Sequence, residues 1–295
     1  MDQICLSEAG RALELDPGQF PFRSRYASVE GASVHYVDEG EGPLLLMIHG
    51  NPTWSFVYAR LIADLCPGFR CVALDLPGFG LSTAPAGYSY KPEEHARVVA
   101  AFLEALDIRD ATLIAHDWGG PIGIGAMAAT EGRIARLCLG NTWAWAVNGD
   151  FHFEWFSKLL GGPIGRFAAR RWAVFVNAVM PSSMRRRKLG ADEMKAFRAP
   201  FRDRSKRAPM HIFPAAITGS GAWLAGLETA VSLFKGPVHF IWPENDIAFR
   251  DKELARWRRL LPQAGVTRLP KCGHYLWLDA PAECASAVRE FMSRG

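Results

Sequence analysis

The stretch that decides the fold reads Ala115-His116-Asp117-Trp118-Gly119-Gly120. The apolar run at 111–115 predicts a buried strand, and the residues after the stretch predict a helix. A strand, a tight turn with a nucleophile at its tip and a helix together form a nucleophile elbow. Such a turn needs small residues two positions before and two positions after the nucleophile, and Ala115 and Gly119 stand there. The stretch therefore predicts an elbow whose nucleophile is Asp117.

An aspartate at the elbow changes the expected chemistry. A carboxylate attacks an sp³ carbon and leaves an ester on the enzyme, and water can then attack the carbonyl of that ester. Asp117 therefore indicates alkyl halides or epoxides as substrates, rather than acyl esters. The structural alternative is that Asp117 only caps the following helix, because aspartate is a favourable N-cap. The partners found elsewhere in the chain favour catalysis.

Short apolar runs alternate with helical segments along the chain. Residues 24–38 predict two short strands around a turn, and helices are expected from Pro92 to about Leu106 and from Pro281 to about Met292. This alternation is typical of the α/β class, with a mostly parallel central sheet flanked by helices. Besides 111–115, buried strands are expected at 43–48, 71–74, 136–139, 238–242 and 266–269.

Residues 143–235 break this alternation. They are rich in aromatic residues and arginine, and their apolar residues have helical spacing. We interpret them as a helical cap inserted late in the sheet. The predicted organisation is a core domain of 1–142 and 236–295 with a cap (lid) domain of 143–235. The basic residues of the cap could meet an anionic membrane, nucleic acid or an acidic partner, but a solvated helical face is the simpler interpretation.

The composition is that of a globular protein. The 295 residues are 49% hydrophobic and 22% charged, which excludes a disordered chain, a collagen and a disulfide scaffold. The formal net charge of +4 is too small to indicate nucleic acid binding, and no apolar run approaches a membrane span. The N-terminus shows no apolar signal segment. We therefore expect a cytoplasmic protein without nucleic acid or membrane partners. Its six cysteines are expected to be reduced: Cys5, Cys66, Cys71, Cys138, Cys272 and Cys284.

A general base and an orienting acid are expected to follow the nucleophile in the chain. Among eight histidines, His274 lies in the loop between the last strand and the terminal helix, where the base is expected. Asp246 lies just past the strand at 238–242, from which its carboxylate can orient the imidazole. Glu244 is the rival acid and is interpreted as a solvated loop residue. A second acid position of this fold, after the strand at 136–139, reads Gly140-Asn141-Thr142 and offers no carboxylate.

The leaving group needs hydrogen-bond donors in a dry pocket. Trp118 has an indole N–H beside the nucleophile, and Asn51 has an amide NH₂ in the loop after the strand at 43–48. We expect both side chains to bind halide and both backbone N–H groups to form an oxyanion hole. Core packing of Trp118 and a turn before proline at Asn51 are the structural alternatives. No metal-ligand spacing appears, so neither a metal nor an organic cofactor is expected.

Beyond these residues, the sequence resembles haloalkane dehalogenases of the α/β-hydrolase fold along nearly the whole chain, most weakly in 143–235. The resemblance implies that Asp117 displaces halide from carbon while Asn51 and Trp118 hold the halide. It also implies that His274, oriented by Asp246, activates water. The two halide-binding residues and the late acid resemble the third subfamily, whose members tend to self-associate, so a homo-oligomer is implied. The resembling stretches are 34–40, 49–56, 75–82, 116–121, 141–145, 246–250 and 273–274.

Other activities of the same fold stay open as alternatives. An epoxide hydrolase resembles the chain at the elbow but uses lid tyrosines as acids, and none of the six tyrosines falls in 143–235. Asn51 also replaces an aromatic residue that is usual in that family. A fluoroacetate dehalogenase usually has arginine where Trp118 stands. A luciferase-like member can keep the same five site residues, and a binding protein that has lost its activity is a further alternative.

Overall fold

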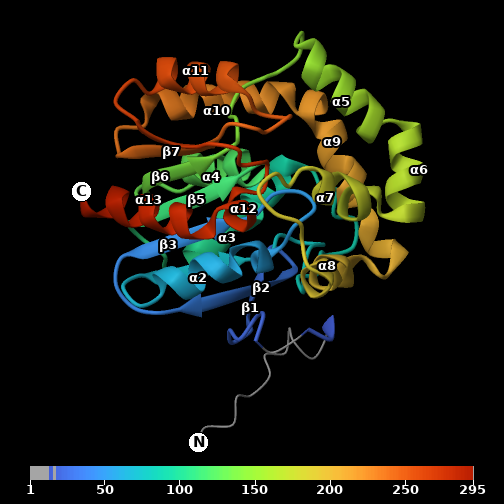
Figure 1. Ribbon diagram of the computed structural model, residues 1–295, viewed down its shortest axis with the longest axis horizontal. Helices are drawn as coiled ribbons and strands as arrows, with labels where there is room; N and C mark the ends of the chain where they lie inside the picture. The colour runs from blue at the N-terminus through green and yellow to red at the C-terminus, as the bar shows by residue number, and fades with distance from the viewer. Residues whose placement is uncertain (1–12, 16–17, 295) are drawn as a thin grey trace, which may run out of the picture.

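The computed structural model describes residues 13–15 and 18–294, and its centre is an eight-stranded sheet (Figure 1). The strand order is β1-β2-β4-β3-β5-β6-β7-β8. The pairs β1–β2 and β2–β4 are antiparallel, and the other neighbours are parallel. The predicted α/β class and the predicted strands are confirmed. The strands are β1 Arg25–Val29, β2 Ala32–Glu39, β3 Leu44–Ile48, β4 Arg70–Leu74, β5 Ala111–His116, β6 Ile134–Gly140, β7 Val238–Pro243 and β8 Gly265–Leu269.

Helices cover both faces of the sheet. Every residue of β3 and β5 is buried, as expected of central parallel strands with helices on either side. α2 (Ala59–Leu65) and α13 (Pro281–Ser293) pack together on one face, and α3 (Pro92–Ala105) and α4 (Gly119–Ala129) pack together on the other (Figure 1). The helices predicted from Pro92 and from Pro281 are thereby confirmed.

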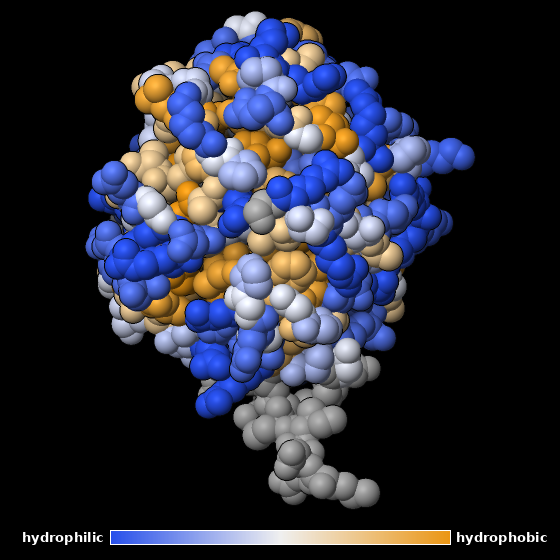
Figure 2. All heavy atoms as spheres, turned by 90° about the vertical axis from the view of Figure 1, so that its left-hand side faces the viewer, coloured by the Kyte–Doolittle hydropathy of each residue, from blue (hydrophilic) through white to orange (hydrophobic). Residues whose placement is uncertain are grey.

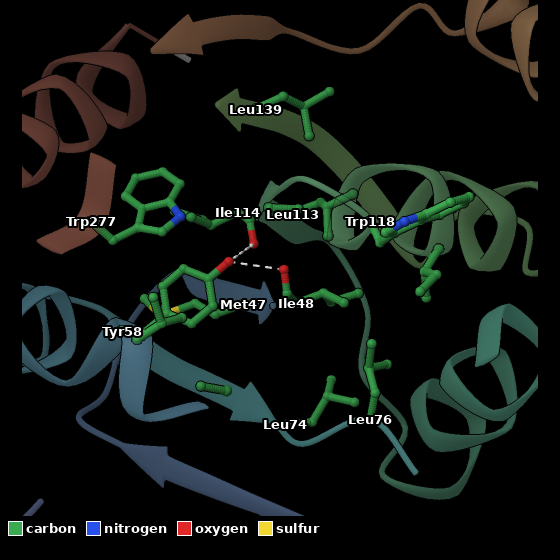
Figure 3. Packing of buried hydrophobic residues seen from close by; sticks show 14 of the residues in the cluster. Met47, Ile48, Tyr58, Leu74, Leu76, Leu113, Ile114, Trp118, Leu139 and Trp277 are labelled. Atoms are coloured by element: carbon green, nitrogen blue, oxygen red, sulfur yellow. Dashed lines mark hydrogen bonds between the residues drawn. The ribbon is translucent and has the colours of Figure 1, made fainter. Parts of the chain in front are cut away.

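One buried hydroxyl group connects the two central strands just before the loops that they support. The Tyr58 hydroxyl donates to the Ile48 carbonyl of β3 at 2.8 Å and lies 3.5 Å from the Ile114 carbonyl of β5 (Figure 3). A buried tyrosine hydroxyl needs such acceptors. Ile48 lies three residues before Asn51, and Ile114 lies three residues before Asp117. The Tyr58 hydroxyl therefore holds together the strand ends from which the two loops start.

Every secondary-structure element between β6 and β7 is a helix. α5 and α6 lie at the outer side of the molecule, and α9 lies between α5 and the sheet (Figure 1). α10 packs against α4 of the sheet layer. The helices are α5 Phe151–Gly161, α6 Pro163–Trp172, α7 Met180–Ser182, α8 Ala191–Arg198, α9 Pro209–Gly219 and α10 Gly221–Leu233. The remaining helices of the described chain are α11 Asp251–Leu260 and α12 Leu276–Asp279, and five-residue or shorter η segments connect some of them.

Figure 2 shows the face away from α5 and α6, where charged and polar side chains surround several apolar areas. Among the described helices, none combines the length and the apolar character needed to cross a membrane. The N-terminal segment and Cys5 lie outside the described residues. The other cysteines are free thiols: Cys66, Cys71, Cys138, Cys272 and Cys284.

Candidate active site

The turn between β5 and α4 has the backbone of a nucleophile elbow. Asp117 has a positive φ of 50°, which is uncommon for a residue other than glycine. Its backbone N–H donates to the Asn141 carbonyl at 2.9 Å, and its carbonyl accepts from the Thr142 hydroxyl at 2.7 Å. A Cβ at Gly119 would lie 2.0 Å from the Ile48 carbonyl oxygen. The close approach that the sequence predicted at Gly119 is therefore present, and the strained aspartate is held by its neighbours.

The Asp117 carboxylate points toward the loop after β3. Its Oδ1 accepts the Asn51 backbone N–H at 2.8 Å. A Cβ at Gly50 would lie 2.4 Å from the same oxygen, so only glycine fits beside the carboxylate. Burial raises the pKa of Asp117, although His274 and the backbone N–H groups of Trp118 and Asn51 oppose this shift. The Asp117 carboxylate is therefore buried and is oriented by hydrogen bonds from backbone N–H groups.

His274 lies between two carboxylates. Its Nδ1 is 2.7 Å from Asp246 Oδ2, and its Nε2 is 3.8 Å from Asp117 Oδ2. Burial lowers the pKa of His274, but the charge and hydrogen bond of Asp246 and the charge of Asp117 outweigh it and raise the pKa to about 9. The hydrogen bond at Nδ1 fixes the ring so that Nε2 faces Asp117.

Asn141 supports this arrangement in a way that the sequence did not suggest. Its Nδ2 donates to Asp246 Oδ2 at 2.5 Å, while its backbone carbonyl accepts from the Asp117 N–H. The Ala248 backbone N–H donates to Asp246 Oδ1 at 2.7 Å. The position that offered no carboxylate therefore supplies an amide, and this amide connects the acid to the elbow. The rival acid Glu244 is exposed and pairs with Arg268, as a solvated loop residue does.

The neighbouring histidines serve the structure of the loops. His116 points away from the carboxylate: its Nδ1 accepts the Trp277 indole N–H at 3.0 Å, and burial holds its pKa well below the usual value. His49 accepts the Leu76 backbone N–H at 2.9 Å. Both rings are buried.

Trp118 and Asn51 both line one cavity with Asp117, and the volume of this cavity is about 330 Å³. Within the described chain, neither the Trp118 indole N–H nor the Asn51 side-chain NH₂ has a protein hydrogen-bond partner. The Trp118 ring packs against Trp143, with ring centroids 4.6 Å apart, and against Phe213 at 5.5 Å. Two N–H donors thus remain available beside the carboxylate, in a cavity whose lining is mostly apolar.

The aromatic side chains after β6 divide between the cavity, the core and the surface. Trp145 packs against Trp257 in the core, while Phe151 and Trp172 are exposed. Tyr275, next to His274, also lines the cavity, with its hydroxyl 3.4 Å from the Asn51 carbonyl. Tyr275 lies outside 143–235, where a tyrosine acid was expected, because it reaches the cavity from the loop after β8. The aromatic lining residues from 143–235 are Trp143, Phe153, Trp155, Phe156 and Phe175.

All five residues predicted for the site therefore lie around one cavity: Asn51, Asp117, Trp118, Asp246 and His274. The first three come from the loops after β3 and β5, and the other two come from the loops after β7 and β8. These loops lie together because the carboxyl ends of parallel strands meet at one edge of the sheet. Among the described residues, no group of three or more His, Cys, Asp or Glu side chains could hold a metal ion.

Comparison with known proteins shows which family the chain resembles. The model of a family described as alpha/beta hydrolase fold matches residues 43–281. Haloalkane dehalogenase 2 of Mycobacterium tuberculosis is 36% identical over 278 residues, which cover 93% of this chain and 96% of that protein. A cis-3-alkyl-4-alkyloxetan-2-one decarboxylase of Shewanella oneidensis is 31% identical over 291 residues, covering 92% of this chain and 89% of that protein.

A solved structure agrees with these relatives. The haloalkane dehalogenase DbeA of Bradyrhizobium elkani superposes with a TM-score of 0.83 at 26% identity, covering 93% of this chain and 100% of that chain. The resemblance read from the motifs is thereby confirmed over nearly the whole length of the chain. The chain therefore belongs to the α/β-hydrolase fold family and, within it, to the haloalkane dehalogenases.

Proposed function

We propose that the protein hydrolyses the carbon–halogen bond of aliphatic halides, giving an alcohol, a halide ion and a proton. The observation that carries the proposal is the placement of a carboxylate, an oriented imidazole and two unpaired N–H donors around one mainly apolar cavity. Such a cavity suits a small apolar substrate with a single reacting end.

In the first step, Asp117 attacks the carbon that bears the halogen. An Asp117 oxygen forms a bond to this carbon, the carbon–halogen bond breaks, and the halide leaves with the electron pair. The Trp118 indole N–H and the Asn51 amide, which have no protein acceptor among the described residues, bind the developing halide charge. The product of this step is an alkyl ester on Asp117.

In the second step, water hydrolyses the ester. His274 Nε2 takes a proton from water, and the resulting hydroxide attacks the ester carbonyl carbon of Asp117. The Asp246 carboxylate stabilises the imidazolium that forms, and the backbone N–H groups of Asn51 and Trp118 stabilise the oxyanion. The alcohol leaves, Asp117 regains its carboxylate, and the proton passes from His274 to solvent.

Halide and proton release from 1-bromobutane, 1-iodobutane and 1,2-dibromoethane tests this proposal. We expect both products in equal amounts from the wild-type protein. A folded protein that releases no halide from any of the three would refute the proposal for simple aliphatic halides. Formation of a diol from an epoxide, measured separately by chromatography because this reaction releases neither halide nor a net proton, tests the alternative left open by the sequence, since Tyr275 is the described tyrosine that lines the cavity.

A second candidate is the ring opening of a strained lactone, because one relative at 31% identity carries the name of an alkyloxetanone decarboxylase. Asp117 would attack the sp³ ring carbon that is bonded to the ring oxygen. The bond between this carbon and the ring oxygen would break, and the carboxylate so formed could be bound by the same N–H donors. In a second step the bond to this carboxylate would break to release CO₂, an alkene would form, and the ester bond would break to regenerate Asp117. A synthetic cis-dialkyl lactone distinguishes the two candidates, since it yields alkene and CO₂ and no halide.

The Trp118→Phe variant tests the proposed halide donor. The change removes one N–H group and keeps an aromatic ring. We expect the rate of halide release to fall about 100-fold, which is the typical loss when an enzyme lacks one hydrogen-bond donor to a charge that develops in the transition state. The matched control is Trp145→Phe, which removes an indole from the core contact with Trp257 and leaves the cavity lining intact. Equal losses in the two variants would contradict the assigned role.

The titration of His274 tests the electrostatics of the site. In the resting enzyme its pKa is raised to about 9, and the charge of Asp117 contributes to this shift. Formation of the ester removes that charge, so the pKa of His274 should fall and yield the neutral base that the second step needs. We expect NMR to show a titration near the raised value in the wild type and a lower one in Asp117→Asn. The rate of ester hydrolysis should rise with pH and then level off, and identical pKa values in both proteins would contradict this account.

A further inference from the structure

The outer surface of α5 and α6 carries an unusual share of exposed apolar side chains. The described chain has nine large hydrophobic side chains with high exposure, and six of them lie on these two helices, with exposed fractions from 41% to 81%. On α5 they recur every four residues and therefore share one face of the helix. We name this set the cap stripe: Phe151, Trp155 and Leu159 on α5, and Ile164, Phe167 and Trp172 on α6.

Arginines border the cap stripe. Arg166, Arg170 and Arg171 of α6 and Arg204 of a neighbouring turn are exposed, and together with Phe167 they line an open hollow of about 650 Å³. Within the part of the chain that the structure describes, none of the four arginines forms an ion pair with an acid. Unpaired arginines next to exposed aromatic rings suit a partner that is both anionic and apolar.

The cap stripe is continuous with the mouth of the active-site cavity. Trp155 and Leu159 belong to the stripe and also line the cavity. Ile247, which is 55% exposed, lines the cavity from the core side. The mouth of the cavity therefore adjoins the apolar surface of α5.

We propose that the face formed by α5 and α6 docks onto an anionic lipid surface. The cap stripe inserts among the acyl chains, and the bordering arginines bind lipid phosphates. From the sequence we expected no membrane partner, because no segment is long enough to span a bilayer, but docking at the surface needs no such segment. If the proposed function holds, the docked cavity mouth lets an apolar substrate enter from the bilayer without crossing water.

Charge decides between a lipid surface and a second copy of the chain. A symmetric dimer through this face would bring the same patch of each copy together and place unpaired arginines opposite one another. The nearby acids cannot offset this, because Glu154 pairs with Lys158 and Asp150 pairs with Lys252. An anionic bilayer provides the missing charge over the whole patch.

Co-sedimentation with vesicles tests the proposal. We expect the protein to bind vesicles of phosphatidylcholine mixed with phosphatidylglycerol, less at high salt, and to stay in solution with phosphatidylcholine alone. Arg170→Gln combined with Arg171→Gln should weaken binding about 25-fold, at about fivefold for each charge near an anionic surface. Phe151→Ser combined with Phe167→Ser should also weaken it. The matched control is Arg258→Gln with Arg259→Gln on α11, both exposed, which removes the same charge elsewhere.

The contrary results are equally definite. A wild type that ignores anionic vesicles, or a control pair that weakens binding as much as Arg170 and Arg171, overturns the proposal. A wild-type dimer in analytical ultracentrifugation that the Phe151 and Phe167 changes dissociate assigns the face to a second copy and also overturns it. None of the substituted residues lines the cavity, so halide release from 1-bromobutane should be unchanged. Binding without halide release would leave the docking surface established and the proposed function refuted.

Discussion

We expect the Asp117→Asn variant to release halide from 1-bromobutane on the order of 10⁴-fold more slowly than the wild type, or not at all. The change keeps the size of the side chain and its contact with the Asn51 N–H, but an amide is a poor nucleophile toward carbon. The variant should stay folded, because the elbow is held by backbone contacts to Asn141 and Thr142 that the substitution leaves intact. Halide measured by ion chromatography over time is the direct readout.

The matched control is Asp192→Asn, at an exposed position of α8 that does not line the cavity. It makes the same chemical change without touching the site and should retain wild-type halide release. A variant Asp117→Asn that still turns over at a substantial fraction of the wild-type rate would show that Asp117 is not the nucleophile.

The second large effect is expected from His274→Gln. Glutamine cannot take a proton from water, so the first step should proceed while the hydrolysis of the ester slows by on the order of 10² to 10⁴. We expect one halide per protein molecule in a rapid burst, followed by little further release. Intact mass spectrometry should show a protein heavier by one butyl group, and digestion should place this group on the peptide with Asp117.

His239→Gln is the matched control for this experiment. His239 lies in β7 and contacts the Thr267 hydroxyl at 2.9 Å, a contact that glutamine can also make. This variant should turn over continuously without a trapped adduct. If His274→Gln instead lost the initial burst as well, His274 would be needed for the first step, and the division of labour between the two steps would be wrong.

The side chains proposed for catalysis were within reach of sequence reasoning because their positions follow from local rules. Asp117 occupies a turn that needs small neighbours, and His274 and Asp246 follow strands whose carboxyl ends meet at one edge. Each inference used only the residues of one strand and one loop. The elbow contacts of Asp117 and the hydrogen bond between His274 and Asp246 agree with those expectations.

Three other features depend on contacts between distant segments. The amide of Asn141 binds a carboxylate 105 residues later in the chain, and no local pattern states that pairing. Tyr275 reaches the cavity from the core side, outside the region in which a tyrosine acid was sought. Helical spacing in 143–235 could not say which aromatic side chains are covered: Trp145, in the loop before α5, packs against Trp257 in the core, whereas Phe151, the first residue of α5, is exposed.

The central claim, a covalent ester on Asp117 that water opens at its carbonyl carbon, is tested most directly by one turnover in ¹⁸O-labelled water. With more enzyme than 1-bromobutane, the alcohol takes its oxygen from the Asp117 carboxylate, and the label enters the enzyme. The account predicts unlabelled butanol and one ¹⁸O atom on the peptide that contains Asp117. Labelled butanol with an unlabelled Asp117 peptide would show that water displaces the halide directly, and would contradict it.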